Sequence, residues 1–227
     1  MVNNANSVYS HYFYRFVMLD FNERCFSLSA NNPSKPTVTA VRKQPKQQRA
    51  ILLVATILEA AAHILEDGTE PFTTNHIAKK AGVSIGSLYQ YFPGADAIMA
   101  ALIEKHVEDE RAAARNVVAT ISTRNSDVMR DLIEAFVDAH ANAPRLSAKL
   151  HALAPAFGLQ EFLANARDEQ ADEIALALAL PQAQVRIAVM AIEGVVLATL
   201  FSDPQQLKSQ IFVDQLYKIA IALLSNL

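Results

Sequence analysis

Residues 73–98 read TTNHIAKKAGVSIGSLYQYFPGADAI, and this stretch decides the fold. The spacing of its apolar residues predicts two short helices, over about 74–81 and about 84–92. A longer helix is predicted over 49–66, with apolar residues along one face. We expect the longer helix to pack behind the short pair, so that the three helices form one small unit.

The ends of the two short helices carry capping residues. Thr73 and Ser84 stand immediately before the helices and can cap them through their hydroxyl groups. Gly82 follows the first helix, where glycine tolerates the positive φ of a helix C-terminus. Leu88 and Phe92 lie four residues apart and are predicted to form the buried face of the second helix. These signals predict a helix, a tight turn and a second helix.

The outward face of the second helix lacks charged side chains. Glycine has little bulk there, so another surface can approach the backbone closely, and the serine and tyrosine hydroxyl groups can donate hydrogen bonds to phosphate oxygens. A helix with these properties suits the major groove of DNA. The residues predicted to face outward are Ile85, Gly86, Ser87, Tyr89, Gln90 and Tyr91.

The rest of the chain predicts an all-α protein. Hydrophobic residues make up 52% of the sequence, while glycine and proline are scarce, at 6 and 9 residues. We expect the next helix to start with Asp96 as its N-cap and to run to about Ile121. Further helices are predicted over 126–141, 144–153, 158–179, 182–202 and 207–225.

Composition divides the chain into three parts. Residues 1–40 are rich in Asn, Ser and Pro without a helical period, and we expect a poorly ordered extension. Residues 41–95 form the candidate DNA-binding domain, and residues 96–227 form a larger helical domain. The stretch 40–95 has six basic and four acidic side chains, whereas 96–227 has eleven basic and seventeen acidic ones. We therefore expect only the front of the chain to meet a polyanion.

The sequence contains no catalytic motif that we recognise. It has no Gly-x-Ser-x-Gly, no His-Glu-x-x-His and no phosphate loop, so we expect neither an enzyme nor a bound cofactor or metal ion. A single cysteine, Cys25, excludes an internal disulfide and is compatible with a reducing cytoplasm. We find no signal peptide and no uncharged apolar run of about 18 residues, so we expect a cytoplasmic protein without a membrane partner.

The combined pattern of 73–98 resembles the helix-turn-helix of the tetracycline-repressor (TetR) family. The matching features are the hydroxyl N-cap, Ile-Ala, Ala-Gly-Val-Ser, Leu-Tyr and an aromatic-Phe pair. The preceding stretch RAILLVATILEAAAHILEDG (49–68) matches with its Arg start, apolar stripe and Gly stop. The resemblance covers about 49–98. It implies an N-terminal three-helix DNA-binding head, joined by a long helix to a larger helical ligand-binding and dimerisation domain.

The resemblance also implies a homodimeric transcription repressor that a small molecule releases from a palindromic operator on double-stranded DNA. The head would contact DNA through its turn, its second helix and the basic arm RKQPKQQR (42–49) ahead of it. The expected contact residues are Arg42, Lys43, Lys46, Arg49, Thr73, Thr74, Asn75, Ser84, Ile85, Gly86, Ser87, Tyr89, Gln90 and Tyr91.

Three positions depart from the family pattern. Ala95 stands where the family usually carries a lysine, so one phosphate anchor is missing. Ile85 replaces a residue that is often basic or polar; it can contact a thymine methyl group but cannot read guanine as arginine does. His76 occupies the capping-box position that is often Glu. These departures leave open an alternative, a helical dimer that has lost specific DNA binding and acts as a ligand- or protein-binding module.

The last two predicted helices are strongly apolar. The helix 182–202 is apolar nearly all round, and the helix 207–225 carries two adjacent apolar stripes. Either both helices are central in one core, or one stripe serves a partner. The resemblance implies the second arrangement, a four-helix interface between two subunits. Its expected residues are Val189, Gly194, Leu197, Phe201, Phe212, Leu216, Ile219 and Leu223.

By the same resemblance, the middle helices would enclose a pocket for an unidentified small-molecule effector. Glu193 is a carboxylate among apolar neighbours and needs a partner, for which His140, Arg186 and a cationic ligand are the candidates. The alternative for each candidate residue is an ordinary place in the core. The candidates are Met129, Phe136, His140, His151, Phe157, Phe162, Met190 and Glu193.

Overall fold

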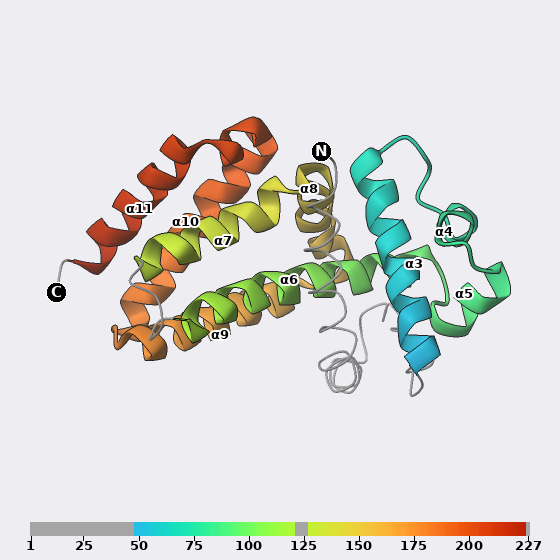
Figure 1. Ribbon diagram of the computed structural model, residues 1–227, viewed down its shortest axis with the longest axis horizontal. Coiled ribbons are helices and arrows are strands. Elements are labelled where there is room, and N and C mark those ends of the chain that lie inside the picture. Colours follow the sequence, from blue (N-terminus) through green and yellow to red (C-terminus); the bar gives the residue numbers. More distant parts are fainter. Residues whose placement is uncertain (1–47, 121–126, 226–227) are drawn as a thin grey trace. The chain divides into compact units, whose positions relative to one another are not determined.

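The computed structural model describes residues 48–120 and 127–225, and every regular element in those residues is a helix (Figure 1). This confirms the predicted all-α fold class. Two 3-10 helices, η1 (Ala154–Phe157) and η2 (Pro204–Lys208), accompany the α-helices. The α-helices are α3 (Gln48–Asp67), α4 (Thr74–Ala81), α5 (Ile85–Tyr91), α6 (Ala95–Ala119), α7 (Val128–Ala141), α8 (Pro144–Leu153), α9 (Gln160–Leu178), α10 (Gln182–Ser202) and α11 (Gln210–Leu224).

The observed helices follow the predicted ones, with three differences at helix starts. The helix predicted from residue 207 begins at Gln210 as α11, after η2. Asp96 lies in the first turn of α6 and does not cap it, because the helix already begins at Ala95. The helix predicted from residue 158 is preceded by η1 and begins at Gln160 as α9. The extension predicted over 1–40 lies outside the described residues.

The chain divides into two compact units whose limits differ from those of the predicted domains. The first unit contains the residues up to Asp109 together with Lys149–Phe157, and the second contains Glu110–Ala148 and Gly158–Leu227. Two of the three divisions fall inside helices, α6 and α8, and the third directly follows η1. The boundary predicted after residue 95 rests on a change in charge and on the start of a helix. Neither feature has to coincide with the limit between two compactly packed units.

The first unit is built around α3, which packs against α4 and α5. The predicted burial of Leu88 and Phe92 is confirmed, since neither side chain is exposed. Fully burying such side chains stabilises a fold by about 1.5–3 kcal/mol each. The large, fully buried side chains contributed by these helices and the residue after α5 are Ile57, Leu58, Ile64, Ile77, Leu88 and Phe92.

A segment distant in sequence also belongs to the first unit. Lys149, on α8, donates from its ammonium group to the backbone carbonyl of Leu65 at 3.2 Å. Leu65 lies in the last turn of α3, where the helix has unsatisfied carbonyl groups and a cation is favoured. The Lys149 side chain therefore fixes the C-terminal end of α3.

The second unit has two apolar clusters that share α10. Helix α9 contacts α10, and α11 lies against α7 and α10 (Figure 1). Val196 of α10 joins a cluster with Ile133 of α7 and Leu216 of α11. Val185, near the start of α10, joins a second cluster that includes Ala171 of α9. Helix α10 is thus packed from two directions.

Among the described residues, α10 is the one helix long and apolar enough to cross a membrane, with a mean hydropathy of 1.9 over its most apolar window. Length and composition are weak evidence for a membrane span, because core helices have the same properties. The polar residues of α10 point to the core-helix alternative: Arg186 and Glu193 form ion pairs with residues of α9.

Candidate nucleic-acid interface

Local capping fixes the turn between α4 and α5. Thr73 accepts a hydrogen bond from the backbone N–H of His76 at 3.3 Å, and its hydroxyl also lies 2.8 Å from His76 Nδ1. Gly82 adopts the left-handed conformation, with φ 67° and ψ 27°. Ser84 accepts from the backbone N–H of Ser87 at 3.0 Å. All three predicted capping roles are confirmed, and histidine takes part in the cap where the family pattern has Glu.

The outward face of α5 is uncharged and largely exposed. The side chains of Ile85 and Tyr89 are 38% and 43% exposed, and Gly86 and Gln90 are exposed as well. The two remaining candidates on this helix, Ser87 and Tyr91, are half-buried. Four of the seven α5 residues are thus exposed, and none of the four is charged.

Hydroxyl groups on this surface are held by one another. The hydroxyl oxygens of Ser84 and Ser87 lie 2.8 Å apart. The hydroxyl oxygen of Thr74, at the start of α4, lies 3.1 Å from that of Tyr89. These contacts orient the two helices of the motif toward a common surface, and each hydroxyl can still offer a lone pair or a proton to a phosphate.

Gly86 is not required by the packing of the protein itself. Its φ lies outside the left-handed region, and an added Cβ would meet only the hydroxyl oxygen of Ser84, at 3.8 Å, an ordinary contact. A glycine inside a helix is destabilising relative to alanine. The packing of the described residues therefore does not require this glycine, which leaves room for another surface to approach α5 closely.

The charges near the motif lie on α3 and α4. Arg49, at the start of α3, and Asn75, in the first turn of α4, are exposed as a DNA contact requires. Two further exposed lysines, Lys79 and Lys80, lie in the last turn of α4 and were not among the expected contact residues. Lys80 pairs with Asp67 at 2.8 Å, and this hydrogen bond lowers the pKa of the Asp67 carboxyl. The predicted arm residues Arg42, Lys43 and Lys46 lie outside the described residues.

Four of the residues expected at a subunit interface pack partly against the core of the second unit. Val189, Leu197, Phe212 and Leu223 are half-buried and pack against the two apolar clusters of the second unit. Leu216 is fully buried in the core of its own chain, so its assignment to an interface is wrong. The stripe of α11 that contains Leu216 serves the core because α7 and α10 cover it.

A different apolar stripe of α10 is exposed. Ile187, Met190 and Phe201 are 54%, 50% and 55% exposed, and the expected interface residue Gly194 lies among them and is exposed too. On α11, Ile211 and Ile219 are exposed. These α10 residues are three, four and seven positions apart, as on one face of a helix. Because α10 is apolar nearly all round, the sequence does not indicate which of its faces other helices cover.

The residues expected to line an effector pocket are divided between the two units. His151 and Phe157 belong to the first unit, where His151 stacks edge-on against His106 with ring centroids 5.3 Å apart. In the second unit, Met129, Phe136 and Phe162 are half-buried. Met190 faces solvent in this chain and does not line an enclosed space within the second unit.

His140 is fully buried and already has partners within the second unit. Its Nδ1 lies 2.9 Å from the carbonyl oxygen of Phe136, and its Nε2 lies 3.2 Å from the carboxylate of Glu110. Its ring also packs against that of Phe136, with centroids 4.7 Å apart. His140 therefore pairs with Glu110. It does not pair with Glu193, for which it was one of the candidate partners.

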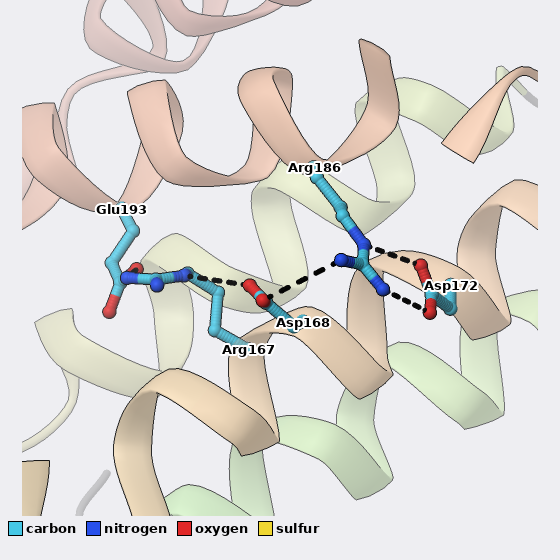
Figure 2. A network of polar contacts seen from close by, with 5 residues as sticks. All are labelled: Arg167, Asp168, Asp172, Arg186 and Glu193. Carbon is cyan, nitrogen blue, oxygen red and sulfur yellow. Dashed lines mark hydrogen bonds and ion pairs between the residues drawn. The ribbon is translucent and has the colours of Figure 1, made fainter. Parts of the chain in front are cut away.

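Glu193 pairs with a residue that the sequence analysis did not consider. Figure 2 shows Arg167 of α9 reaching Glu193, at 3.3 Å between Nη1 and Oε2. Arg186, another candidate partner of Glu193, instead binds Asp172 through two hydrogen bonds of 2.8 and 2.6 Å, and also lies near Asp168 (Figure 2). No sequence signal distinguishes the two arginines, since the register of α9 against α10 selects the partner.

The family comparison falls on the helix-turn-helix. A family model described as "Bacterial regulatory proteins, tetR family" matches residues 57–102, which contain α4 and α5 with parts of α3 and α6. This match includes the capped turn at Gly82 and the exposed face of α5 described above.

Curated relatives are similar over part of the chain. The nucleoid occlusion factor SlmA of Actinobacillus pleuropneumoniae serotype 5b (strain L20) is 38% identical over 73 residues, 31% of this chain and 34% of the relative. SlmA of Haemophilus influenzae (strain PittGG) is 30% identical over 125 residues, 53% of this chain and 55% of the relative. The chain thus matches between about a third and about half of the length of these relatives.

Solved structures share the fold over most of the chain. The multidrug binding protein EbrR complexed with imidazole aligns with a TM-score of 0.55 at 19% identity, covering 75% of this chain and 94% of that one. A TetR-family transcriptional regulator from Streptomyces coelicolor aligns with a TM-score of 0.51 at 20% identity, covering 76% and 98%. At these identities the likeness shows the fold.

The helix-turn-helix geometry, the family match on the same residues and the shared all-α fold agree with one another. The matched family is one of bacterial regulatory proteins, and the solved structures share the all-α fold. Residues 57–102 of this chain thus form a DNA-binding helix-turn-helix segment of the kind found in the tetR family of bacterial regulatory proteins.

Proposed function

We propose that this regulator acts in the cytoplasm as a homodimeric repressor, which binds a palindromic operator and is released from it by a small molecule. The observation that carries the proposal is the exposed stripe of Ile187, Met190, Gly194 and Phe201 on α10. A stripe this apolar and exposed marks a protein contact in a DNA-binding protein. A second copy related by a twofold axis would cover it with its own stripe.

A twofold dimer would present two α5 helices to two operator half-sites. Each head would contact phosphates and bases through the motif and through the basic residues ahead of it. We assign DNA contact to Arg42, Lys43, Lys46, Arg49, Thr73, Thr74, Asn75, Ser84 and the six outward residues of α5, and we add Lys79.

The effector is proposed to bind among the helices of the second unit. Phe136 is half-buried there and supplies an aromatic group that packs against the His140 ring. An effector releases the repressor only if it binds the non-binding conformation more tightly than the operator-binding one. A screen for compounds that raise the melting temperature of the protein and lower its operator affinity tests this part.

The dimer is tested by measuring mass in solution by light scattering. We expect a dimer for the wild-type protein and a monomer when Ile187 and Phe201 are both replaced by Glu. Leu52→Glu is the control, because Leu52 is also an exposed apolar side chain, 38% exposed, but lies on α3. A wild-type monomer, or a double variant that stays dimeric, would contradict the proposed interface.

Operator binding is tested by selection from random DNA with the full-length protein at two salt concentrations. We expect an inverted repeat whose affinity falls steeply with salt. Tyr89→Ala should remove this binding while leaving the dimer intact, because Tyr89 is exposed and contributes little to the core. A folded dimer that selects no sequence would favour the alternative function as a ligand- or protein-binding module.

A second candidate function is nucleoid occlusion, the role named for the SlmA relatives. The observation that favours it is the extent of the Haemophilus influenzae match, 125 residues, well beyond the 57–102 of the family model. Mapping the bound sites across the genome distinguishes the two functions. A few promoter sites support a repressor, whereas many sites dispersed over the chromosome support nucleoid occlusion.

A further inference from the structure

We propose that α5 reads A·T base pairs and that Ile85 contacts the C5-methyl group of a thymine in each half-site. The inference rests on the proposed operator binding and names the base chemistry that the same surface recognises. Two observations carry it. The side chains of Ile85 and Gln90 are exposed on the outward face of α5, and that face has no charged side chain.

Ile85 occupies the position from which a recognition helix reaches bases. It is the first residue of α5, and the N-terminal residues of such helices contact base edges. Its branched side chain is 38% exposed although it is apolar. The next residue, Gly86, has no side chain and leaves the space beside Ile85 open toward solvent. An approaching base pair would therefore meet the Ile85 side chain early.

The neighbouring hydroxyl groups are already engaged within the protein. Ser84 and Ser87 share a contact of 2.8 Å, and Tyr89 lies 3.1 Å from the hydroxyl of Thr74. Reading a base edge with any of them requires that the internal hydrogen bond be broken or shared. The alkyl group of Ile85 needs no such exchange, because burying it against an apolar group releases only water.

The charged side chains that most commonly read a G·C pair are absent from α5. Its sequence, IGSLYQY, contains no arginine or lysine for the acceptors of guanine and no carboxylate for the amino group of cytosine. The remaining exposed polar side chain, Gln90, has an amide that matches the donor and acceptor of adenine. The methyl group of thymine is the apolar group on the major-groove edge, so Ile85 and Gln90 both match A·T pairs.

The methyl contact is tested by removing the methyl group from the DNA and the side chain from the protein. The probe is the duplex obtained by selection with the full-length protein, in which each thymine is replaced in turn by deoxyuridine. For the wild-type protein we expect one position per half-site at which the replacement weakens binding about four-fold, the effect of losing one buried methyl group. Ile85→Ala should weaken binding to the thymine duplex and should bind both duplexes equally.

Leu52→Ala is the matched control, because Leu52 is as exposed as Ile85 but lies on α3. This variant should keep the wild-type preference for thymine over deoxyuridine. The inference is overturned if no thymine position is sensitive, if Ile85→Ala keeps the preference, or if the selected half-sites contain only G·C pairs. If the wild-type protein selects no sequence, operator binding itself fails, and this outcome is distinct from the other three.

Discussion

The side chains of Thr74 and Tyr89 join the two helices of the DNA-binding motif. Thr74 Oγ1 lies 3.1 Å from the hydroxyl oxygen of Tyr89, fifteen residues further along the chain. One residue begins α4 and the other lies within α5. The contact sets the direction of the exposed Tyr89 ring relative to the start of α4, so that the two hydroxyl groups proposed to contact phosphates lie together.

Tyr89→Phe removes this contact while keeping the aromatic ring. We expect operator affinity to fall about five-fold, since a hydrogen bond of this kind contributes about 1 kcal/mol. The melting temperature should change little, because Tyr89 is exposed. Thr74→Val is the matched variant, and the double variant should lose less operator affinity, in free energy, than the sum of the two single losses. Strictly additive losses would show that the two hydroxyl groups act independently.

Gly86→Ala should stabilise the protein and weaken its binding to DNA. The fold accepts a Cβ at this position, and alanine stabilises a helix by about 0.5–1 kcal/mol over glycine. The added methyl group would hold the DNA away from the backbone of α5. Urea unfolding and operator titration of the same variant measure the two effects. An unchanged operator affinity would show that the glycine does not serve close approach.

Ala179→Gly should stabilise the second unit. Ala179 caps the C-terminus of α9 in the left-handed region, with φ 53° and ψ 42°. Alanine is strained in that conformation and glycine is not, although glycine gains more freedom on unfolding. The expected net gain in the free energy of unfolding is about 0.5–1 kcal/mol. Ala177→Gly, inside the same helix, is the control and should destabilise it.

The free energy of unfolding should decrease in acid, because carboxylates that form ion pairs with arginines become protonated. Hydrogen bonding to Arg186 lowers the pKa of the Asp172 carboxyl below its ordinary value of 3.8. Because the folded pKa lies below the unfolded one, the stabilisation is complete above pH 3.8 and is lost as the pH falls through the lowered value. Asp214, with Arg130, behaves in the same way.

Urea unfolding of the wild-type protein and of Arg186→Gln at a series of pH values between neutrality and strong acid checks this expectation. The difference in stability between the two proteins should be constant near neutrality and should shrink below the ordinary carboxyl pKa. A difference that grows as the pH falls would contradict the assigned direction.

The sequence by itself determined the all-α fold and the local geometry of the DNA-binding motif. Thr73, Gly82 and Ser84 act within a few residues of their own positions, so their roles follow from residue type and spacing alone. The burial of Leu88 and Phe92 follows in the same way from helical periodicity. The family resemblance rested on these local signals, which is why it was visible before the structure.

Only the tertiary structure decided the partners of side chains on the larger helices. Glu193 pairs with Arg167 because of the register of α9 against α10, and two arginines of one chain look alike in sequence. Leu216 is buried, and Ile187 is exposed, because neighbouring helices cover one stripe of each helix and leave another open. A helix that is apolar all round has no local signal for its covered side, since that choice belongs to the helices that pack against it.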